Sequence, residues 1–224
     1  MLARAKTLLL IALAGCALVW RFSSHIDPYY LDIITGIGIN IILAVSLNLI
    51  NGTTGQFSLG HAGFMAVGGY TSAAFTVYAG PKFIAALGFL PAVLAQNVVF
   101  LIALLIAGVS AGVLGLLVGI PSLRLRGDYL AIVTLGMGEI VRVVILNIDA
   151  IGGARGFSGI PAYSNLFWVL SLTAATIAVV ASLINSSHGR AFLSVREDEI
   201  AAEAMGINTT YYKVTAFVIG SFFA

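Results

Sequence analysis

Charged residues are scarce in this sequence. They make up 9% of its 224 residues, and 60% of the residues are hydrophobic. Soluble domains carry about 25% charged residues. The 11 Lys and Arg and 9 Asp and Glu leave a net charge of +2, which is too small to suggest a nucleic-acid partner. One cysteine excludes a disulfide framework and a cysteine-based zinc site. The composition predicts an integral membrane protein.

Motifs of covalent chemistry are also missing. The sequence has no Gly-x-x-x-x-Gly-Lys-[Ser/Thr] loop for ATP and no Gly-x-Ser-x-Gly turn for a serine nucleophile. Ser58 and His61 are three residues apart, which raises the possibility of an intramembrane hydrolase, but no third group is expected at the same depth. The other histidines, His25 and His188, lie in different segments, so no metal site is expected. We expect no enzyme activity and no cofactor bound by this chain.

Long apolar runs predict an all-α, polytopic transmembrane helix bundle that forms one domain over residues 1–224. A helix needs about 20 apolar residues to cross a bilayer, because backbone groups left unpaired in lipid are costly. Six spans are expected, at Thr7–Trp20, Leu31–Ile50, Thr54–Tyr78, Val93–Gly119, Tyr129–Ile148 and Leu166–Ile184, and a seventh starts at Val214. Since the seventh run is too short to cross, we expect the chain to be truncated at its C-terminus.

Basic residues in short loops predict the orientation, because the side with more of them is cytoplasmic. With a cytoplasmic N-terminus, the inner loops carry Arg4, Lys6, Arg124, Arg126, Arg190, Arg196 and Lys213, and the outer loops carry Arg21, Lys82 and Arg155. A cytoplasmic N-terminus is therefore favoured. The start also resembles a lipoprotein signal ending at Cys16, but the apolar run continues to Trp20, which favours a membrane span.

The third expected span is unusually polar. Gly55, Gln56, Ser58 and His61 fall at its start, among further glycines and threonines. Glycine and polar side chains in a membrane helix allow close packing and hydrogen bonds between helices. Glycine-rich membrane segments also break and line a solute path. The sequence leaves both interpretations open.

The fifth expected span contains two charged residues, Glu139 and Arg142. Their spacing places them on one helix face, where each lowers the cost of the other in the membrane. Glu139 lies near the middle of the span, and Arg142 is able to extend toward the surface. The pair has two interpretations, a structural ion pair or a functional site.

A polar loop, residues 185–212, is expected on the cytoplasmic side. Its pattern predicts a helix that ends at Gly206, before the chain restarts at residues 208–210. Ile200, Ala204 and Met205 stand among acidic residues in that helix. Such a helix fits a groove on a soluble partner. The alternative is a helix on the lipid surface, which the excess of acidic residues disfavours.

Three blocks of sequence carry a family resemblance. They are residues 48–64 (NLINGTTGQFSLGHAGF), 123–135 (LRLRGDYLAIVTL) and 189–208. Together they resemble the inner-membrane permeases of branched-chain amino acid ABC importers, and more closely the M-type permease of the pair. The resemblance covers most of the chain from about residue 31 onward.

The resemblance implies roles for particular residues. In that family a cytoplasmic helix docks on the ATPase, and Ala201-Ala202-x-x-x-Gly206 matches the core of its motif, although Ile200 occupies the usual glutamate position and Glu199 stands one place earlier. The residues expected to couple to the ATPase are Arg190, Arg196, Glu199, Ala201, Ala202, Met205 and Gly206. The residues expected along the translocation pathway are Gly55, Gln56, Ser58, His61 and Glu139.

The resemblance also implies partners. It predicts a multi-pass subunit of the bacterial inner membrane, surrounded by lipid and assembled with a companion permease, two cytoplasmic ATPases that use the ATP, and an extracytoplasmic solute-binding protein. Branched-chain amino acids are the expected solutes. The alternatives are a urea or short-amide permease of the same kind, an ion-coupled transporter or channel with Glu139 as its proton or cation site, and a structural membrane scaffold.

Overall fold

A computed structural model describes residues 15, 19, 26–88, 91–122 and 128–224. Of the first expected span, Thr7–Trp20, only Gly15 and Val19 are among these residues. Five basic residues used to predict the orientation also lie outside them: Arg4, Lys6, Arg21, Arg124 and Arg126. In the described part of the chain every regular element is a helix. The all-α prediction is therefore confirmed.

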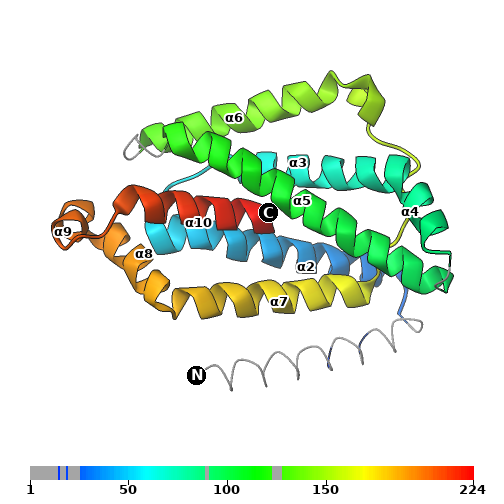
Figure 1. Cartoon of the computed structure of the whole chain (residues 1–224), viewed down its shortest axis with the longest axis horizontal. Helices are drawn as coiled ribbons and strands as arrows, with labels where there is room; N and C mark the ends of the chain where they lie inside the picture. Colours follow the sequence, from blue (N-terminus) through cyan, green and yellow to red (C-terminus); the bar gives the residue numbers. More distant parts are fainter. Residues whose placement is uncertain (1–14, 16–18, 20–25, 89–90, 123–127) are drawn as a thin grey trace.

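Helices of very different length make up this part of the chain. They are α2 (Pro28–Asn48), η2 (Leu49–Thr53), α3 (His61–Ala74), η3 (Phe75–Ala79), α4 (Gly80–Ala86), α5 (Ala92–Ser122), α6 (Asp128–Leu146), η4 (Asp149–Ile151), η5 (Gly153–Arg155), α7 (Leu166–Ile184), α8 (Ser187–Glu197), α9 (Glu199–Ala204) and α10 (Thr209–Phe223). The long helices run roughly along one axis, with α9 at one end of the bundle and α4 at the other (Figure 1).

Four of these helices are long and apolar enough to cross a membrane. They cover Pro28–Thr53, Ala92–Pro121, Tyr129–Leu146 and Leu166–Ile184, and they agree with the second, fourth, fifth and sixth expected spans. The last expected span begins earlier than its apolar run, at Thr209 rather than Val214, because the Asn208 side chain accepts a hydrogen bond from the Tyr211 N–H and starts α10 there.

The expected span Thr54–Tyr78 is not one continuous helix, and the break that its glycine and polar residues left open is present. The second span continues through the π-helix η2 to Thr53, residues 55–60 are not helical, and α3 begins only at His61. In Figure 1, α3 starts farther from the α9 end of the bundle than η2 ends. The break follows from Gly55, which has a φ of +69° that disfavours any residue with a side chain.

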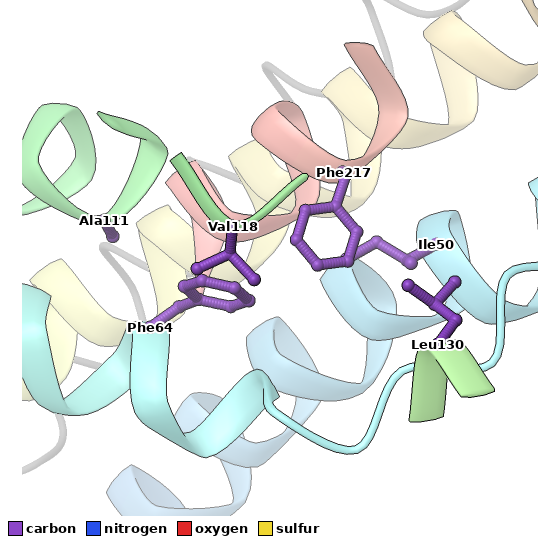
Figure 2. Close-up of a cluster of buried hydrophobic side chains, with 6 residues drawn as sticks. All are labelled: Ile50, Phe64, Ala111, Val118, Leu130 and Phe217. Atoms are coloured by element: carbon purple, nitrogen blue, oxygen red, sulfur yellow. The ribbon is translucent and has the colours of Figure 1, made fainter. Parts of the chain in front are cut away.

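One apolar cluster joins five of the helices in the described part of the chain. Its buried members come from η2, α3, α5, α6 and α10, and they are Ile50, Phe64, Ala111, Val118, Leu130 and Phe217 (Figure 2). Phe64 and Phe217 meet edge to face with ring centroids 5.5 Å apart, the arrangement that aromatic quadrupoles favour. The cluster packs α10 and α3 against the end of the second span.

A second cluster lies on the other side of η2. It contains Leu49, Val180, Phe192 and Ala216, which come from η2, α7, α8 and α10. Leu49 and its neighbour Ile50 are both fully buried, and each belongs to a different cluster. The π-helix therefore sits between the two apolar cores, directly before the non-helical segment.

Candidate functional site

The non-helical segment Gly55–Gly60 links the second span to α3. Its residues alternate regularly, since Gln56, Ser58 and Gly60 are buried whereas Gly55, Phe57 and Leu59 are exposed. The segment therefore presents two polar side chains, those of Gln56 and Ser58, to the interior of an apolar bundle.

Three side chains in and beside this segment have buried polar atoms without hydrogen-bond partners. They are both amide atoms of Gln56, the hydroxyl of Ser58 and Nδ1 of His61, in residues that are 4%, 2% and 7% exposed. Buried polar groups are almost always hydrogen-bonded, and each exception calls for an explanation. Three exceptions within six residues mark this place as the candidate site.

The segment is held in place by neighbours on both sides. Ser46 Oγ of α2 and His61 Nε2 lie 2.8 Å apart. The Ser58 N–H donates to Asn51 Oδ1 at 3.1 Å, and the Leu59 N–H donates to Thr134 Oγ1 of α6 at 3.0 Å. Ser46 and Thr134 are not among the site residues that the sequence predicts. Their signal was a lone hydroxyl residue within an apolar run, which in a membrane segment is a sign of a polar contact.

The start of α3 lies at this site and has no side-chain cap, because Gly60 occupies the capping position. The first N–H groups of a helix lack partners within the helix, and they carry a partial positive charge. Gly60 is required here by packing, since a Cβ atom would overlap the carbonyl oxygen of Thr134. In membrane transporters, interrupted helices place such ends next to anionic groups of the solute.

The geometry does not support hydrolysis. His61 Nε2 is occupied by Ser46, and the Ser58 hydroxyl has no hydrogen-bond partner, so the two side chains do not form a nucleophile and base pair. Among the described residues there is also no group of three His, Cys, Asp or Glu side chains placed to hold a metal ion. An amide, a hydroxyl and an imidazole are instead suited to hold the polar ends of a small solute.

Glu139 is not part of this cluster. Its side chain is 58% exposed on α6, and its Oε2 pairs with Nε of Arg142 at 2.8 Å. The α6 face that packs against the site is a different one, since Thr134 and Gly138 meet Gly60 and Gly63 there. The ion pair expected from the spacing of Glu139 and Arg142 is thus present, but it lies on an exposed face of α6, away from the face that packs against the site.

The loop expected on the cytoplasmic side, residues 185–212, is helical, and it contains a second helix before the expected one. It forms α8 and α9, which meet at Asp198, a residue in extended conformation whose carboxylate accepts hydrogen bonds from the N–H groups of Ile200 and Ala201. This acidic cap starts a new helix directly after α8 ends. Helix α9 does end before Gly206, whose φ is +82°, as expected.

The predicted coupling residues separate into two groups. Ala201, Met205 and Gly206 are exposed on or directly after α9, and Ile200 beside them is 70% exposed. Ala202 is buried, and Glu199 pairs with Lys213 of α10 at 2.6 Å. The exposed group forms a mostly apolar surface, whereas the inward group attaches α9 to the bundle.

The two predicted coupling arginines of α8 behave differently. Arg190 is exposed, and its Nη2 donates to Ser187 of the same helix at 3.0 Å. Arg196 reaches the end of the second span, where its Nη1 donates to the Gly52 carbonyl oxygen at 3.0 Å. The backbone of Gly55, a predicted pathway residue, packs against the same arginine.

Comparison with known proteins identifies relatives over nearly the whole chain. Residues 29–224 match the family model described as the permease component of the branched-chain amino acid transport system. The chain is 37% identical to the high-affinity branched-chain amino acid transport system permease proteins LivM of Salmonella typhimurium and Escherichia coli, over 98% of its own length. It is 30% identical to a probable LivM permease of Methanocaldococcus jannaschii over 82% of its length. No solved structure matches it significantly.

The relatives are longer than this chain. It covers 55% of the length of the two enterobacterial proteins and 61% of the archaeal one. The match to the family model includes both the non-helical segment with its buried polar side chains and the α8–α9 loop.

Proposed function

Because the chain belongs to the family of permease components of branched-chain amino acid transport systems, we propose that it is a membrane permease subunit of an ATP-driven importer of branched-chain amino acids. The subunit provides a path for the solute and a surface on which ATPases act. It carries out no covalent chemistry and binds no cofactor, and the ATP is hydrolysed by partner subunits.

One observation carries this proposal. Gln56, Ser58 and His61 bring buried polar atoms without partners into an apolar bundle, beside the uncapped start of α3. The ammonium and carboxylate of an amino acid supply the partners that these groups lack. An aliphatic side chain suits the apolar surroundings of the segment. Gly55 belongs to the pathway as the backbone turn that presents these side chains, and Glu139 lies outside it.

The arrangement of charges supports an orientation. Helix α8, which carries Arg190 and Arg196, and the start of α10, which carries Lys213, lie at the same end of the bundle as α9, whereas α4, which carries Lys82, and η5, which carries Arg155, lie toward the other end (Figure 1). By the positive-inside rule the α9 end faces the cytoplasm, and the proposal keeps the cytoplasmic N-terminus that the basic residues of the sequence favour. The protein is then a multi-pass subunit of the bacterial inner membrane.

We assign the exposed surface of α9 to contact with an ATPase. Ile200 and Met205 are 70% and 83% exposed and adjoin Ala201. An apolar helix face of this kind fits a groove on a soluble protein. The complete transporter comprises a companion permease, two ATPases and an extracytoplasmic solute-binding protein.

Uptake into proteoliposomes tests the proposal. The full-length natural chain is reconstituted with its companion permease, the ATPases and the binding protein, and ATP-dependent uptake of radiolabelled leucine and urea is measured. We expect leucine uptake that requires ATP and no urea uptake. Uptake of urea alone would assign the protein to the permeases of urea and short amides. Uptake of neither solute by a verified complex would contradict both substrate assignments.

The same vesicles distinguish an ion-coupled transporter. Leucine uptake driven by a proton or sodium gradient without ATP, and abolished by Glu139→Gln, would overturn the proposal in favour of that alternative. We expect the gradient alone to drive no uptake.

A further inference from the structure

A direct contact connects α8 to the segment that carries the candidate site. Nη1 of Arg196 donates to the Gly52 carbonyl oxygen at 3.0 Å, although the two residues are 144 positions apart. At Gly55 an added Cβ atom would lie 2.9 Å from Cγ and 3.5 Å from Cα of Arg196. The guanidinium therefore holds the last turn of the second span, and the arginine stem lies against the turn that follows.

Gly55 is suited to this contact for two separate reasons. Its φ of +69° is a conformation that L side chains rarely adopt, and the space beside it is filled by Arg196. No other residue type satisfies both conditions without displacing α8 or the segment. The position of the turn is thus tied to the position of α8.

The buried polar side chains follow immediately in the chain. Gln56 is the next residue, and its N–H donates to the Ile50 carbonyl oxygen at 3.3 Å. The Ser58 N–H donates to Asn51 Oδ1 at 3.1 Å. Because these bonds connect the segment to the same turn that Arg196 holds, a shift of that turn moves both polar side chains.

The end of α8 that carries Arg196 also leads to the exposed surface of α9. Arg196 is two residues before Asp198, whose carboxylate caps α9. The ion pair between Glu199 and Lys213 and the hydrogen bond from Thr209 to Glu203 attach α9 to α10. A force applied at Ile200 or Met205 is therefore transmitted through a short, hydrogen-bonded path to Arg196.

We propose that Arg196 and Gly55 form a mechanical joint through which movement of α8 and α9 shifts the Gly52–Gly60 segment and so opens or closes the polar site around Gln56 and Ser58. The inference rests on the proposed function, because it assumes that an ATPase acts on α9. Arg196 is proposed as a positioning residue, because its guanidinium bonds to the Gly52 carbonyl oxygen and acts on the polar site only through that turn.

The first test separates hydrolysis from transport in the reconstituted full-length complex. Arg196→Gln is expected to retain ATP hydrolysis stimulated by the loaded binding protein, while leucine uptake per ATP falls by about tenfold, the scale of one lost hydrogen bond to a charged group. Arg196→Lys, which keeps a donor for the Gly52 carbonyl, is expected to recover part of the uptake. Arg155→Gln, a change of an exposed arginine at the opposite end, is the matched control.

Gly55→Ala tests the same joint by a different change, and Gly159→Ala is its control. Gly159 has a φ of +77°, but nothing lies within 4 Å of its added Cβ atom. Both variants place a side chain at a positive φ, but only Gly55→Ala meets Arg196, so a loss of coupling in Gly55→Ala alone reports that contact. Two results would overturn the proposal that Arg196 and Gly55 couple α8 to the segment. One is the same leucine uptake per ATP in both glycine variants, and the other is wild-type uptake per ATP in Arg196→Gln.

A second readout needs no transport and covers variants that lose uptake for other reasons. In a Cys16→Ser background, a thiol reagent labels Phe57→Cys, which lies in the segment at a position that is 54% exposed. We expect ATP with vanadate to change the labelling rate, and Arg196→Gln to abolish that change. If ATP with vanadate still changes the labelling rate in Arg196→Gln, the proposed role of the Arg196–Gly55 contact is contradicted. If the wild-type complex takes up no leucine, the proposed function is contradicted instead.

Discussion

The hydroxyl of Ser46 and Nε2 of His61 lie 2.8 Å apart and connect the two helices on either side of the break in the chain. Ser46 is fully buried on α2, and His61 is the first residue of α3. Between them the chain leaves the helical conformation for six residues. This hydrogen bond therefore fixes the start of α3 relative to the second span, although no helix continues from one to the other.

Replacing Ser46 tests the structural role of this bond. Ser46→Ala leaves His61 Nε2 buried without a partner, which costs about 1–3 kcal/mol of stability. We expect a lower thermal unfolding midpoint of the purified complex. The control is Ser72→Ala, which removes only a hydrogen bond within α3, from Ser72 to the Gly69 carbonyl oxygen at 2.9 Å. Equal midpoints for the two variants would falsify this role.

The close contact of α3 with α6 predicts a steric effect at Gly60. The φ of Gly60 is −89°, so alanine fits the backbone there, but its Cβ atom would overlap the Thr134 carbonyl oxygen. Overpacking of this kind costs about 1–3 kcal/mol, and we expect Gly60→Ala to lower the unfolding midpoint and the yield of assembled complex. Gly69→Ala on the same helix meets open space and is expected to behave like the wild type.

A variant at Gln56 distinguishes a solute path from tight packing. Gln56→Met keeps the approximate volume and removes two buried polar atoms that lack partners, so the fold is expected to be as stable as the wild type or more stable. If Gln56 binds the solute, KM for leucine rises by about 10- to 100-fold, the scale of a lost hydrogen bond to a charged group. Uptake kinetics and thermal unfolding of the same preparation provide the two measurements.

Thr173→Val is the opposite case and serves as the control for Gln56. Thr173 is buried, and its hydroxyl bonds to the carbonyl oxygens of Gly38 and Val169, so its loss is expected to lower stability without changing KM. An unchanged KM in Gln56→Met would show that Gln56 is a packing residue.

The exposed ion pair on α6 predicts that Glu139 is dispensable for the solute. Glu139→Gln alone leaves Arg142 without its partner in a membrane segment, and we expect a reduced yield of complex. The double variant Glu139→Gln/Arg142→Gln removes both charges, and we expect it to restore the yield and to transport leucine. If the double variant assembles normally but transports nothing, Glu139 belongs to the pathway after all.

Several features of the fold were predictable because they depend on local physics. Lipid offers no hydrogen-bond partners, so a chain this apolar has to be helical within it, and four of the predicted spans are present. The end of α9 before Gly206 and the restart at Asn208 follow from a left-handed glycine and a side-chain cap. The interruption before α3 was visible only as an excess of glycine and polar residues.

The outward position of Glu139 was not predictable from its spacing. A soluble helix shows its buried face by alternation of polar and apolar residues, but in a membrane both the protein interior and the lipid are apolar. Residues on both sides of α6 are therefore hydrophobic, and the pattern does not show which side is inside. Spacing correctly predicted the pair with Arg142, since that contact is local.

By itself the sequence determined the membrane class of this protein, four of its helical spans, its family and the polar character of the segment around Gln56. Only the tertiary structure decided that His61 pairs with Ser46, that Arg196 holds Gly52, and that Glu139 lies outside the site. The physical reason is the range of the interactions. Helix formation and capping depend on neighbours a few residues away, whereas these contacts depend on how whole helices rotate and pack against each other.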